Sequence, residues 1–311
     1  MIAPAPSLST VAPRAGAPRI LVIGDVMTDV IVRPEGPLAK GSDRRAAIRF
    51  EPGGSAANQA VWLAYFGAEV DFVGRVAAQE VDAEAARFAR AGVNARLAGD
   101  RAHPTGRLVA LIDPSGERSF YTDRGANEAL SSADIPDRYI AGAAHLHLSG
   151  YSFFAPSPRA AVFDVMRRAG EKPISVDPAS AEFLREAGAK AFLEWTRGAT
   201  ILFPNEEEAA VLVGSDDPEA QCMALAALFP LVVIKRGAAG AIAAAGERRW
   251  SVEAPKRQAI DATGAGDAFV AAFLAARLKG AEIETALARA AEAGSEAVVK
   301  IGARPDALHP D

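Results

Sequence analysis

Short apolar runs alternate with longer, alanine-rich amphipathic stretches along most of this chain of 311 residues. Apolar runs of this length, several of which end at Gly, Asp or Asn, predict buried strands, and the amphipathic stretches predict helices. The predicted strands are residues 20–23, 70–73, 108–112, 145–148, 174–176, 201–203 and 232–234. The predicted helices are residues 56–66, 82–91, 158–169, 181–196, 206–213, 219–228, 267–278 and 283–299. Strands that are apolar on both faces indicate an α/β fold, in which a mainly parallel sheet is covered by helices and ligands bind at the carboxyl ends of the strands.

Two segments, residues 30–50 and 106–121, break this alternation because they are more polar, β-like and not followed by a helix. In the second segment Pro114 and Gly116 predict a turn between two strands, which makes a hairpin. An ordinary edge hairpin and a small β lid over the strand ends are both compatible with this pattern.

Charge and composition exclude several classes of protein. Lys and Arg total 34 against 39 Asp and Glu, so the net charge of −5 argues against a nucleic acid partner. No apolar run reaches the roughly 18–20 residues that span a bilayer, so no membrane partner is expected. The single cysteine, Cys222, excludes an intramolecular disulfide and a Cys-rich zinc site and is expected to be a small buried residue. Residues 1–17, rich in Pro and Ala, predict a disordered leader rather than a secretory signal, followed by one α/β domain over 18–311 and a cytoplasmic location.

The segment Asp261-Ala-Thr-Gly-Ala-Gly-Asp267 leads into a predicted helix. A Gly-rich turn at the positive end of a helix can direct several backbone N–H groups at an anion. Asp267 fits two roles that are compatible with each other, a favourable carboxylate in the first helical turn and a base that takes a proton from a hydroxyl group. The segment Asn205-Glu-Glu-Glu208 is by itself typical of an N-capped helix with an acidic first turn.

The segment that ends at Asp267, together with Gly53-Gly-Ser-Ala-Ala-Asn58 further upstream, resembles the two signatures of the ribokinase-like, phosphofructokinase B-type carbohydrate and nucleoside kinase family. The resemblance runs from about Ile20 to about Arg304. It implies a three-layer sandwich with a small β-sheet lid, formed here by about residues 30–50 and 106–122. It also implies an ATP-dependent phosphotransferase that acts on a hydroxymethyl group of a sugar or sugar-like acceptor, nucleosides included.

The resemblance also implies the roles of individual residues. The implied catalytic group is Asp267, with the anion hole formed by Gly264, Ala265 and Gly266. The implied acceptor-binding residues are Asp29, Gly53, Gly54 and Asn58, although Asn58 would equally suit a helix N-terminus. Ser55 stands where relatives that act on phosphorylated sugars often carry Lys, which favours a non-phosphorylated acceptor unless Arg44, Arg45 or Arg107 supplies the charge.

For the nucleotide side, the resemblance implies ATP and Mg²⁺, with Glu208 acting on Mg²⁺ through water. The implied nucleotide-binding residues are Asn205, Glu208, Lys235 (or its neighbour Arg236), Gly237 and Gly240. The implied K⁺ site comprises Asp261, Thr263, Ala297 and Gly302. Relatives often pair through the lid, so a homodimer is expected.

Two further sequence features and one alternative function complete the predictions. His145 and His147 share one face of a predicted strand, and buried, hydrogen-bonded histidines are a better interpretation than half of a metal site. Asp177 ends a predicted strand on the active-site side and is expected to orient a neighbour rather than to act in catalysis. The alternative function is a catalytically silent sugar-binding regulator with the same fold, against which the intact Asp267 and its glycines weigh.

Overall fold

The computed structural model describes residues 18–37, 40–112 and 118–305. The predicted leader (1–17) and the predicted turn residues Pro114 and Gly116 lie outside the described residues.

A nine-stranded sheet forms the centre of the molecule, in the order β13-β12-β11-β10-β9-β8-β1-β4-β5. All neighbouring strands from β5 to β11 are parallel, and β12 and β13 extend one edge as an antiparallel pair. The parallel strands therefore bring their carboxyl ends to one edge of the sheet. The bounds are β1 Arg19–Ile23, β4 Glu69–Ala77, β5 Val93–Asp100, β8 His145–Ser149, β9 Ile174–Asp177, β10 Ile201–Leu202, β11 Leu231–Lys235, β12 Ala241–Ala245 and β13 Arg248–Val252.

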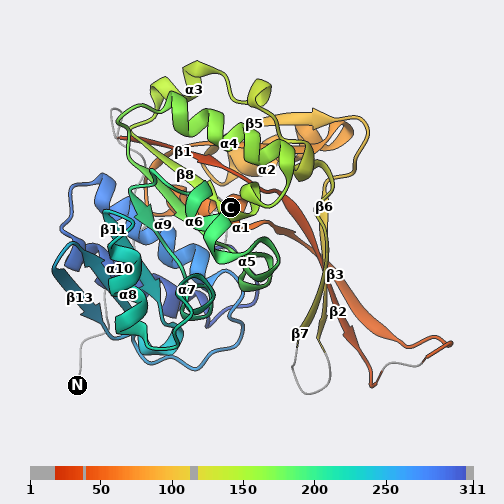
Figure 1. Cartoon of the computed structure of the whole chain (residues 1–311). Helices are drawn as coiled ribbons and strands as arrows, with labels where there is room; N and C mark the ends of the chain where they lie inside the picture. The colour runs from red at the N-terminus through yellow and green to blue at the C-terminus, as the bar shows by residue number, and fades with distance from the viewer. Residues whose placement is uncertain (1–17, 38–39, 113–117, 306–311) are drawn as a thin grey trace.

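Helices cover both faces of this sheet because its central strands are apolar on both faces (Figure 1). In β1, Ile20 and Val22 pack into one core while Leu21 and Ile23 pack into the other, as the twofold period of a strand requires. The first face carries α1 Ser55–Tyr65, α2 Val81–Arg90, α9 Ala265–Leu278 and α10 Ile283–Ala297. The second face carries α3 Asp137–Gly142, α4 Pro156–Arg168, α5 Ala181–Ala187, α6 Ala189–Trp195, α7 Glu206–Val213 and α8 Pro218–Ala226. The predicted three-layer α/β fold is confirmed.

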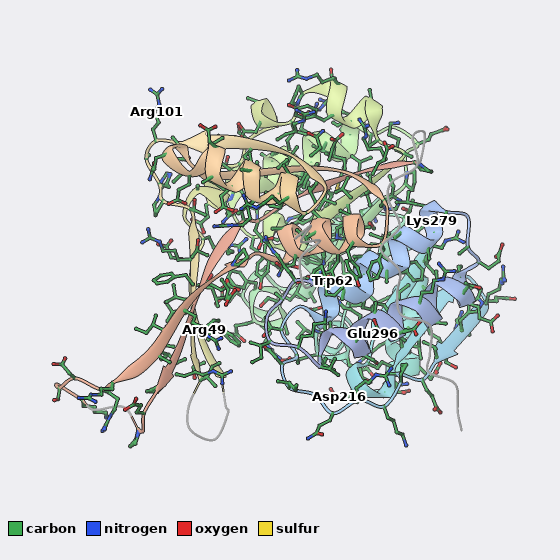
Figure 2. All side chains as sticks on the ribbon, turned by 180° about the vertical axis from the view of Figure 1, so that it is seen from behind. Arg49, Trp62, Arg101, Asp216, Lys279 and Glu296 are labelled. Carbon is green, nitrogen blue, oxygen red and sulfur yellow. The ribbon has the colours of Figure 1, made fainter. Side chains whose placement is uncertain are left out.

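A separate four-stranded sheet has the order β3-β2-β6-β7 and projects from the body of the molecule (Figure 1). The apolar run 108–112 lies in this sheet and not in the central one, because β6 pairs with β2 and β7. Seen from behind, the side chains of this sheet, Arg49 among them, lie away from the crowded body that holds Trp62 (Figure 2). The bounds are β2 Met27–Pro34, β3 Ala46–Gly53, β6 Gly106–Ile112 and β7 Arg118–Asp123.

The prediction of one helix over residues 181–196 is wrong, because Gly188 divides it into α5 and α6. Gly188 has a φ of +85°, which a continuous right-handed helix does not allow and which glycine adopts without strain. The described residues also form short 3₁₀ helices, which are η1 Ala78–Glu80, η2 Gly125–Ala129, η3 Ser132–Asp134, η4 Gly150–Phe153 and η5 Gly237–Ala239.

Cys222 is buried in α8, as predicted. Over the described ranges, no helix is both long and apolar enough to span a lipid bilayer.

Candidate active site

The amino ends of α1 and α9 meet near the carboxyl edge of the central sheet. Asp25, directly after β1, fixes the start of α1 because its carboxylate accepts hydrogen bonds from the backbone N–H groups of Ser55 (3.1 Å) and Ala56 (3.3 Å). The Ser149 hydroxyl, at the end of β8, donates to the same carboxylate at 3.0 Å. Asp25 therefore anchors the start of α1.

Asp267 lies in the first turn of α9 and faces α1 across this junction. Its Oδ1 accepts a hydrogen bond from the Ser55 hydroxyl at 2.7 Å, and its Oδ2 accepts one from Asn58 Nδ2 at 3.1 Å. Burial raises the pKa of Asp267 to about 7, against the opposing effects of the Ser55 hydrogen bond and the Lys235 charge. A carboxylate with this pKa can accept a proton at neutral pH.

The turn before α9 is shaped by Gly264, the N-cap of the helix. Gly264 has a φ of +77°, and a Cβ at this position would collide with the carbonyl group of Ala303. The Ala265 N–H already donates to the Ala262 carbonyl at 3.3 Å, so it is less suited to the predicted anion hole than its neighbours. The N–H groups of Gly266 and Asp267 belong to the first helical turn, where amides have no partner within the helix.

The predicted acceptor residues gather around the start of α1. Gly53 ends β3 beside Asp29 of β2, and a Cβ at Gly53 would overlap the Asp29 carboxylate. Asp29 is half-buried, and burial raises its pKa to about 6 although the nearby Arg304 charge opposes the rise. Gly54 is the N-cap of α1, and a Cβ there would meet the Asp25 carbonyl. The structure therefore brings all four predicted acceptor residues together.

Arg304 belongs to the same site, although the sequence gave no reason to include it. Its Nε donates to Asn58 Oδ1 at 2.9 Å and its Nη2 donates to the Gly53 carbonyl at 3.2 Å. A guanidinium group only donates hydrogen bonds, so it fixes the Asn58 amide with the oxygen toward Arg304 and the NH₂ group toward Asp267. Burial lowers the pKa of Arg304 to about 10, which leaves it charged at neutral pH.

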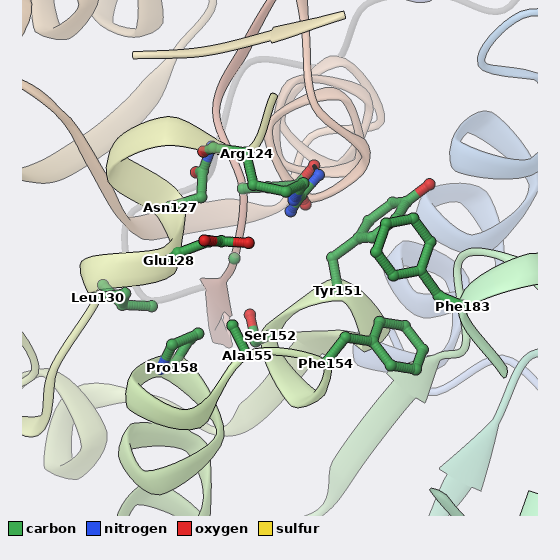
Figure 3. Close-up of a pocket in the computed structure, with 12 residues that line it drawn as sticks. Arg124, Asn127, Glu128, Leu130, Tyr151, Ser152, Phe154, Ala155, Pro158 and Phe183 are labelled. Carbon is green, nitrogen blue, oxygen red and sulfur yellow. Dashed lines mark hydrogen bonds and ion pairs between the residues drawn. The ribbon is translucent and has the colours of Figure 1, made fainter. Parts of the chain in front are cut away.

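A small cavity opens beside Asp25 (Figure 3). The Arg124 guanidinium lies over the ring of Tyr151 at 4.2 Å, and the ring of Phe183 contacts the Tyr151 ring edge-on, with 5.6 Å between the ring centroids. Burial, with Asp25 as the next cause, raises the pKa of Tyr151, so its hydroxyl stays protonated. These residues lie on connections after β7 and β8 and on α5, and no local motif in the sequence marks them.

Among the residues predicted to bind the nucleotide, Asn205 and Glu208 form a reciprocal capping box at the start of α7. The Asn205 side chain accepts from the Glu208 N–H, and the Glu208 carboxylate accepts from the Asn205 N–H, each at 2.8 Å. The capping interpretation is thus confirmed. Glu208 is also buried, and burial raises its pKa while the Lys235 charge opposes this effect.

Lys235, the last residue of β11, and Arg236, which follows it, have different environments. Lys235 Nζ lies 2.9 Å from both carboxylate oxygens of Asp177, and its side chain is 12% exposed. The Arg236 guanidinium instead pairs with the partly exposed Glu206 at 2.9 Å. Gly237 begins η5 and Gly240 follows it, so both lie in the connection between β11 and β12. Asp177, at the end of β9, thus forms a close ion pair with Lys235.

The segments predicted to hold K⁺ also meet. Asp261 accepts hydrogen bonds from the N–H groups of Thr263 (2.9 Å) and Gly302 (3.2 Å). Ala297 is the last residue of α10, and the next carbonyl, that of Val298, accepts from the Asp261 N–H at 3.1 Å. Within the described ranges, no three or more His, Cys, Asp or Glu side chains are grouped as a metal site.

His145 and His147 are buried and both bond to the Ser175 hydroxyl, at 2.8 and 2.7 Å. Burial lowers the pKa of each to about 3, so both are neutral. The predicted buried, hydrogen-bonded histidines are confirmed.

The chain is similar in sequence and in fold to known proteins. Residues 17–309 match the pfkB family of carbohydrate kinases. An ATP-dependent ribose-1-phosphate kinase of Halopiger xanaduensis is 31% identical over 298 residues, which cover 92% of this chain and 94% of the relative. The structure of a ribokinase from Arabidopsis thaliana complexed with ribose and ATP is 28% identical, with a TM-score of 0.77 and coverage of 92% and 94%. The structure of adenosine kinase from Sinorhizobium meliloti has a TM-score of 0.84 at 24% identity, with coverage of 94% and 97%.

Proposed function

The chain belongs to the pfkB family of carbohydrate kinases, and we propose that it transfers the γ-phosphoryl group of ATP to a hydroxymethyl group of a sugar or nucleoside. The predicted enzyme class, an ATP-dependent carbohydrate kinase, is confirmed at the level of the family. The observation that carries the proposal is the position of Asp267, which is held by Ser55 and Asn58 at the amino end of α9.

In this proposal Asp267 is the general base. It accepts the proton of the acceptor hydroxyl, whose oxygen bonds to the γ-phosphorus, while the bond to the bridging oxygen breaks and its electron pair leaves with ADP. The amides of Gly266 and Asp267, with the dipole of α9, stabilise charge on the transferred group. Gly264 provides the turn, and Ala265 contributes mainly the start of the helix.

The acceptor would lie against Asp29, Gly53, Gly54 and Asn58. The fixed Asn58 amide presents N–H donors, and Asp29 presents oxygen acceptors, which together suit the hydroxyl groups of a sugar. The cavity beside Tyr151 would take the part of the acceptor that lies away from the reacting hydroxymethyl group. Its guanidinium and aromatic groups suit polar edges and C–H faces.

For the nucleotide, we propose that Asn205, Glu208, Lys235, Gly237 and Gly240 line the phosphate side. Glu208 fits an outer-sphere role toward Mg²⁺, because it is a buried carboxylate close to both Lys235 and Asp177 and makes one hydrogen bond to the backbone. Mg²⁺, when bound, would neutralise charge on the ATP phosphates. The contacts of Asp261 with Thr263 and Gly302, near Ala297, support the proposed K⁺ site.

We also propose that the four-stranded sheet is a lid over the site and joins two copies of the chain in a homodimer. Ile48, Phe50, Phe120 and Tyr121 are exposed on it, and apolar side chains in such positions are typical of protein contacts. The cytoplasmic location stays a prediction from the sequence.

ADP release would test the proposal, measured with ATP, Mg²⁺ and K⁺ over a panel of sugars, phosphorylated sugars and nucleosides. We expect strong turnover with one acceptor class and its loss in Asp267→Asn. Saturable sugar binding without turnover on any acceptor would instead support the silent regulator.

A further inference from the structure

Lys235 lies beside the first turn of α9, where the proposed transfer takes place. A Cβ built on Gly266 would be 3.8 Å from Lys235 Nζ, so the ammonium group is next to the backbone of the proposed anion hole. The carboxylates of Asp177, Glu208 and Asp267 all contribute to its electrostatic environment. Burial alone would lower the pKa of Lys235, but these carboxylates outweigh it and hold the pKa above its ordinary value.

Asp177 is held in place by four contacts. Its oxygens accept from Lys235 (2.9 Å to each), from Gln59 Nε2 (2.9 Å) and from the Ala179 N–H (3.3 Å). Gln59 is the residue after Asn58 in α1. The buried pair of Gln59 and Asp177 therefore links the helix of the acceptor site to the lysine of the phosphate side.

The support behind Gln59 is a chain of hydrogen bonds with one consistent direction. Because Gln59 Nε2 faces a carboxylate, it donates, and Gln59 Oε1 must accept from His147 Nε2 at 2.7 Å. Neutral His147 then accepts at Nδ1 from the Ser175 hydroxyl, whose oxygen accepts from His145. Every donor in this series points toward Asp177, and the series requires the neutral form of His147, which burial favours.

An ion pair with Asp177 does not by itself require Lys235 to lie beside the amino end of α9. An ammonium group has three N–H donors, and within the described residues that of Lys235 makes its hydrogen bonds to the two carboxylate oxygens of Asp177. A donor therefore remains for an anion at the α9 turn. Charge on the phosphoryl oxygens is the main thing a kinase must stabilise, since phosphoryl transfer depends on positioning and electrostatics.

We propose that Lys235 contacts the phosphoryl group during its transfer, and that Asp177, supported by Gln59, is the positioning residue for Lys235. This proposal rests on the proposed kinase function. In the step, the acceptor oxygen bonds to the γ-phosphorus, the bond to the bridging oxygen breaks with its electron pair going to ADP, and the hydroxyl proton goes to Asp267. Lys235 keeps its proton throughout and supplies positive charge only.

The first experiment compares Lys235→Met with Lys172→Met. Lys172 is a half-buried lysine that donates to the Ala143 carbonyl at 2.7 Å, next to the opposite end of β9. We expect Lys235→Met to lower kcat by about 100-fold or more, as loss of one transition-state donor does, while the Kd for ATP changes less than threefold. Lys172→Met should leave kcat unchanged. A kcat within threefold of the unmodified protein, or a loss confined to ATP affinity, would overturn the proposal.

Chemical rescue separates charge from folding. Lys235→Cys in a Cys222→Ala background has a single thiol, which 2-bromoethylamine converts to a lysine-like ammonium and 1-bromopropane converts to an uncharged chain. We expect aminoethylation alone to raise kcat at least tenfold. Equal activity after the two alkylations would contradict the proposal even if Lys235→Met fails to fold.

The positioning role is tested by a double-mutant cycle. Asp177→Asn should lower kcat about tenfold in the unmodified protein and have little further effect in Lys235→Met, because it acts through the lysine. An undiminished effect in the double variant would show that Asp177 acts by another route. If the unmodified chain turns over no acceptor, the kinase function itself fails, which is a different result from an active chain that is indifferent to Lys235.

Discussion

The central sheet and the four-stranded sheet use apolar residues in opposite ways. In the central sheet, large side chains such as Phe72 and Ile23 are completely buried, and the buried carboxylate of Asp177 lies at the carboxyl end of β9. In the four-stranded sheet, Phe50 is 71% exposed and Tyr121 is 66% exposed. The body therefore holds its own charges in place by packing around them, whereas the smaller sheet keeps apolar surface available for a contact outside itself.

The difference between the two sheets predicts that residues of the body, around the central sheet, carry out catalysis. Asp267→Asn removes the proposed base but keeps the shape and the hydrogen-bond partners, so we expect kcat to fall about a thousandfold or more. The measurement is ADP release with the best acceptor. Retention of a tenth of the activity would show that Asp267 is not the base.

The two sheets should also differ in how much their large side chains contribute to the free energy of unfolding. Phe72→Ala leaves a cavity beside Phe88, whose ring is 4.8 Å away, and should lower the free energy of unfolding by about 3–5 kcal/mol. Phe50→Ala on the four-stranded sheet should change it by less than about 0.5 kcal/mol. Urea denaturation of both variants at low protein concentration measures the difference. Similar losses would mean that the smaller sheet is part of the folding core.

Much of this division is present in the sequence because it arises from local patterns. The apolar runs identify the parallel strands, the glycines next to Asp267 identify a helix start with free amides, and the spacing of Asn205 and Glu208 identifies a capping box. The edge strands are different. Ala241–Ala245 is rich in alanine, a good helix former and a poor strand former, and it becomes strand β12 only because it pairs with β11 and β13.

The contacts that complete the site depend on residues far apart in the sequence. Arg304 reaches Asn58 across 246 positions, and Gln59 reaches Asp177 across 118. Arg304 and Gln59 are unremarkable in their local sequence, so periodicity and motif spacing give no signal for these two residues. The family resemblance implies a role for Lys235 on the phosphate side, but its partner, Asp177, can be identified only from the fold.

A test at the junction of the two sheets concerns Arg304, which touches both Gly53 of β3 and Asn58 of α1. Arg304→Met keeps the length of the side chain and removes its donors, so the Asn58 amide loses the partner that fixes its orientation. We expect the acceptor KM to rise about tenfold, with a smaller fall in kcat. Arg304→Lys should recover part of the loss, and an unchanged KM would show that the Asn58 orientation does not depend on Arg304.

The smallest expected effect is a dependence of stability on pH, which arises from Asp267 in the body of the molecule. The folded pKa of Asp267 is raised to about 7 from 3.8, so the folded state binds this proton more tightly than the unfolded state. The contribution of Asp267 to stability therefore falls as pH rises from about 4 to about 7. Asp267→Asn should raise the Tm of the free protein by a few degrees more at pH 8 than at pH 5.

The rate should show the opposite trend with pH. An unprotonated base is required, so kcat/KM of the unmodified protein should rise through about pH 7. In the stability measurement, a Tm difference between Asp267→Asn and the unmodified protein that is the same at pH 5 and pH 8 would mean that the fold does not raise the pKa of Asp267.

The hydrogen bonds that join the start of α1 to Asp267 and Arg304 also determine when, during synthesis and folding, the active site can be completed. Ser55 and Asp267 are 212 positions apart, and Gly53 and Arg304 are 251 apart. On the ribosome, Gly53 and Ser55 are therefore synthesised long before Asp267 and Arg304. Closing loops of this length is slow, so recovery of catalysis during refolding should lag behind formation of the helices and report the last long-range contacts to form.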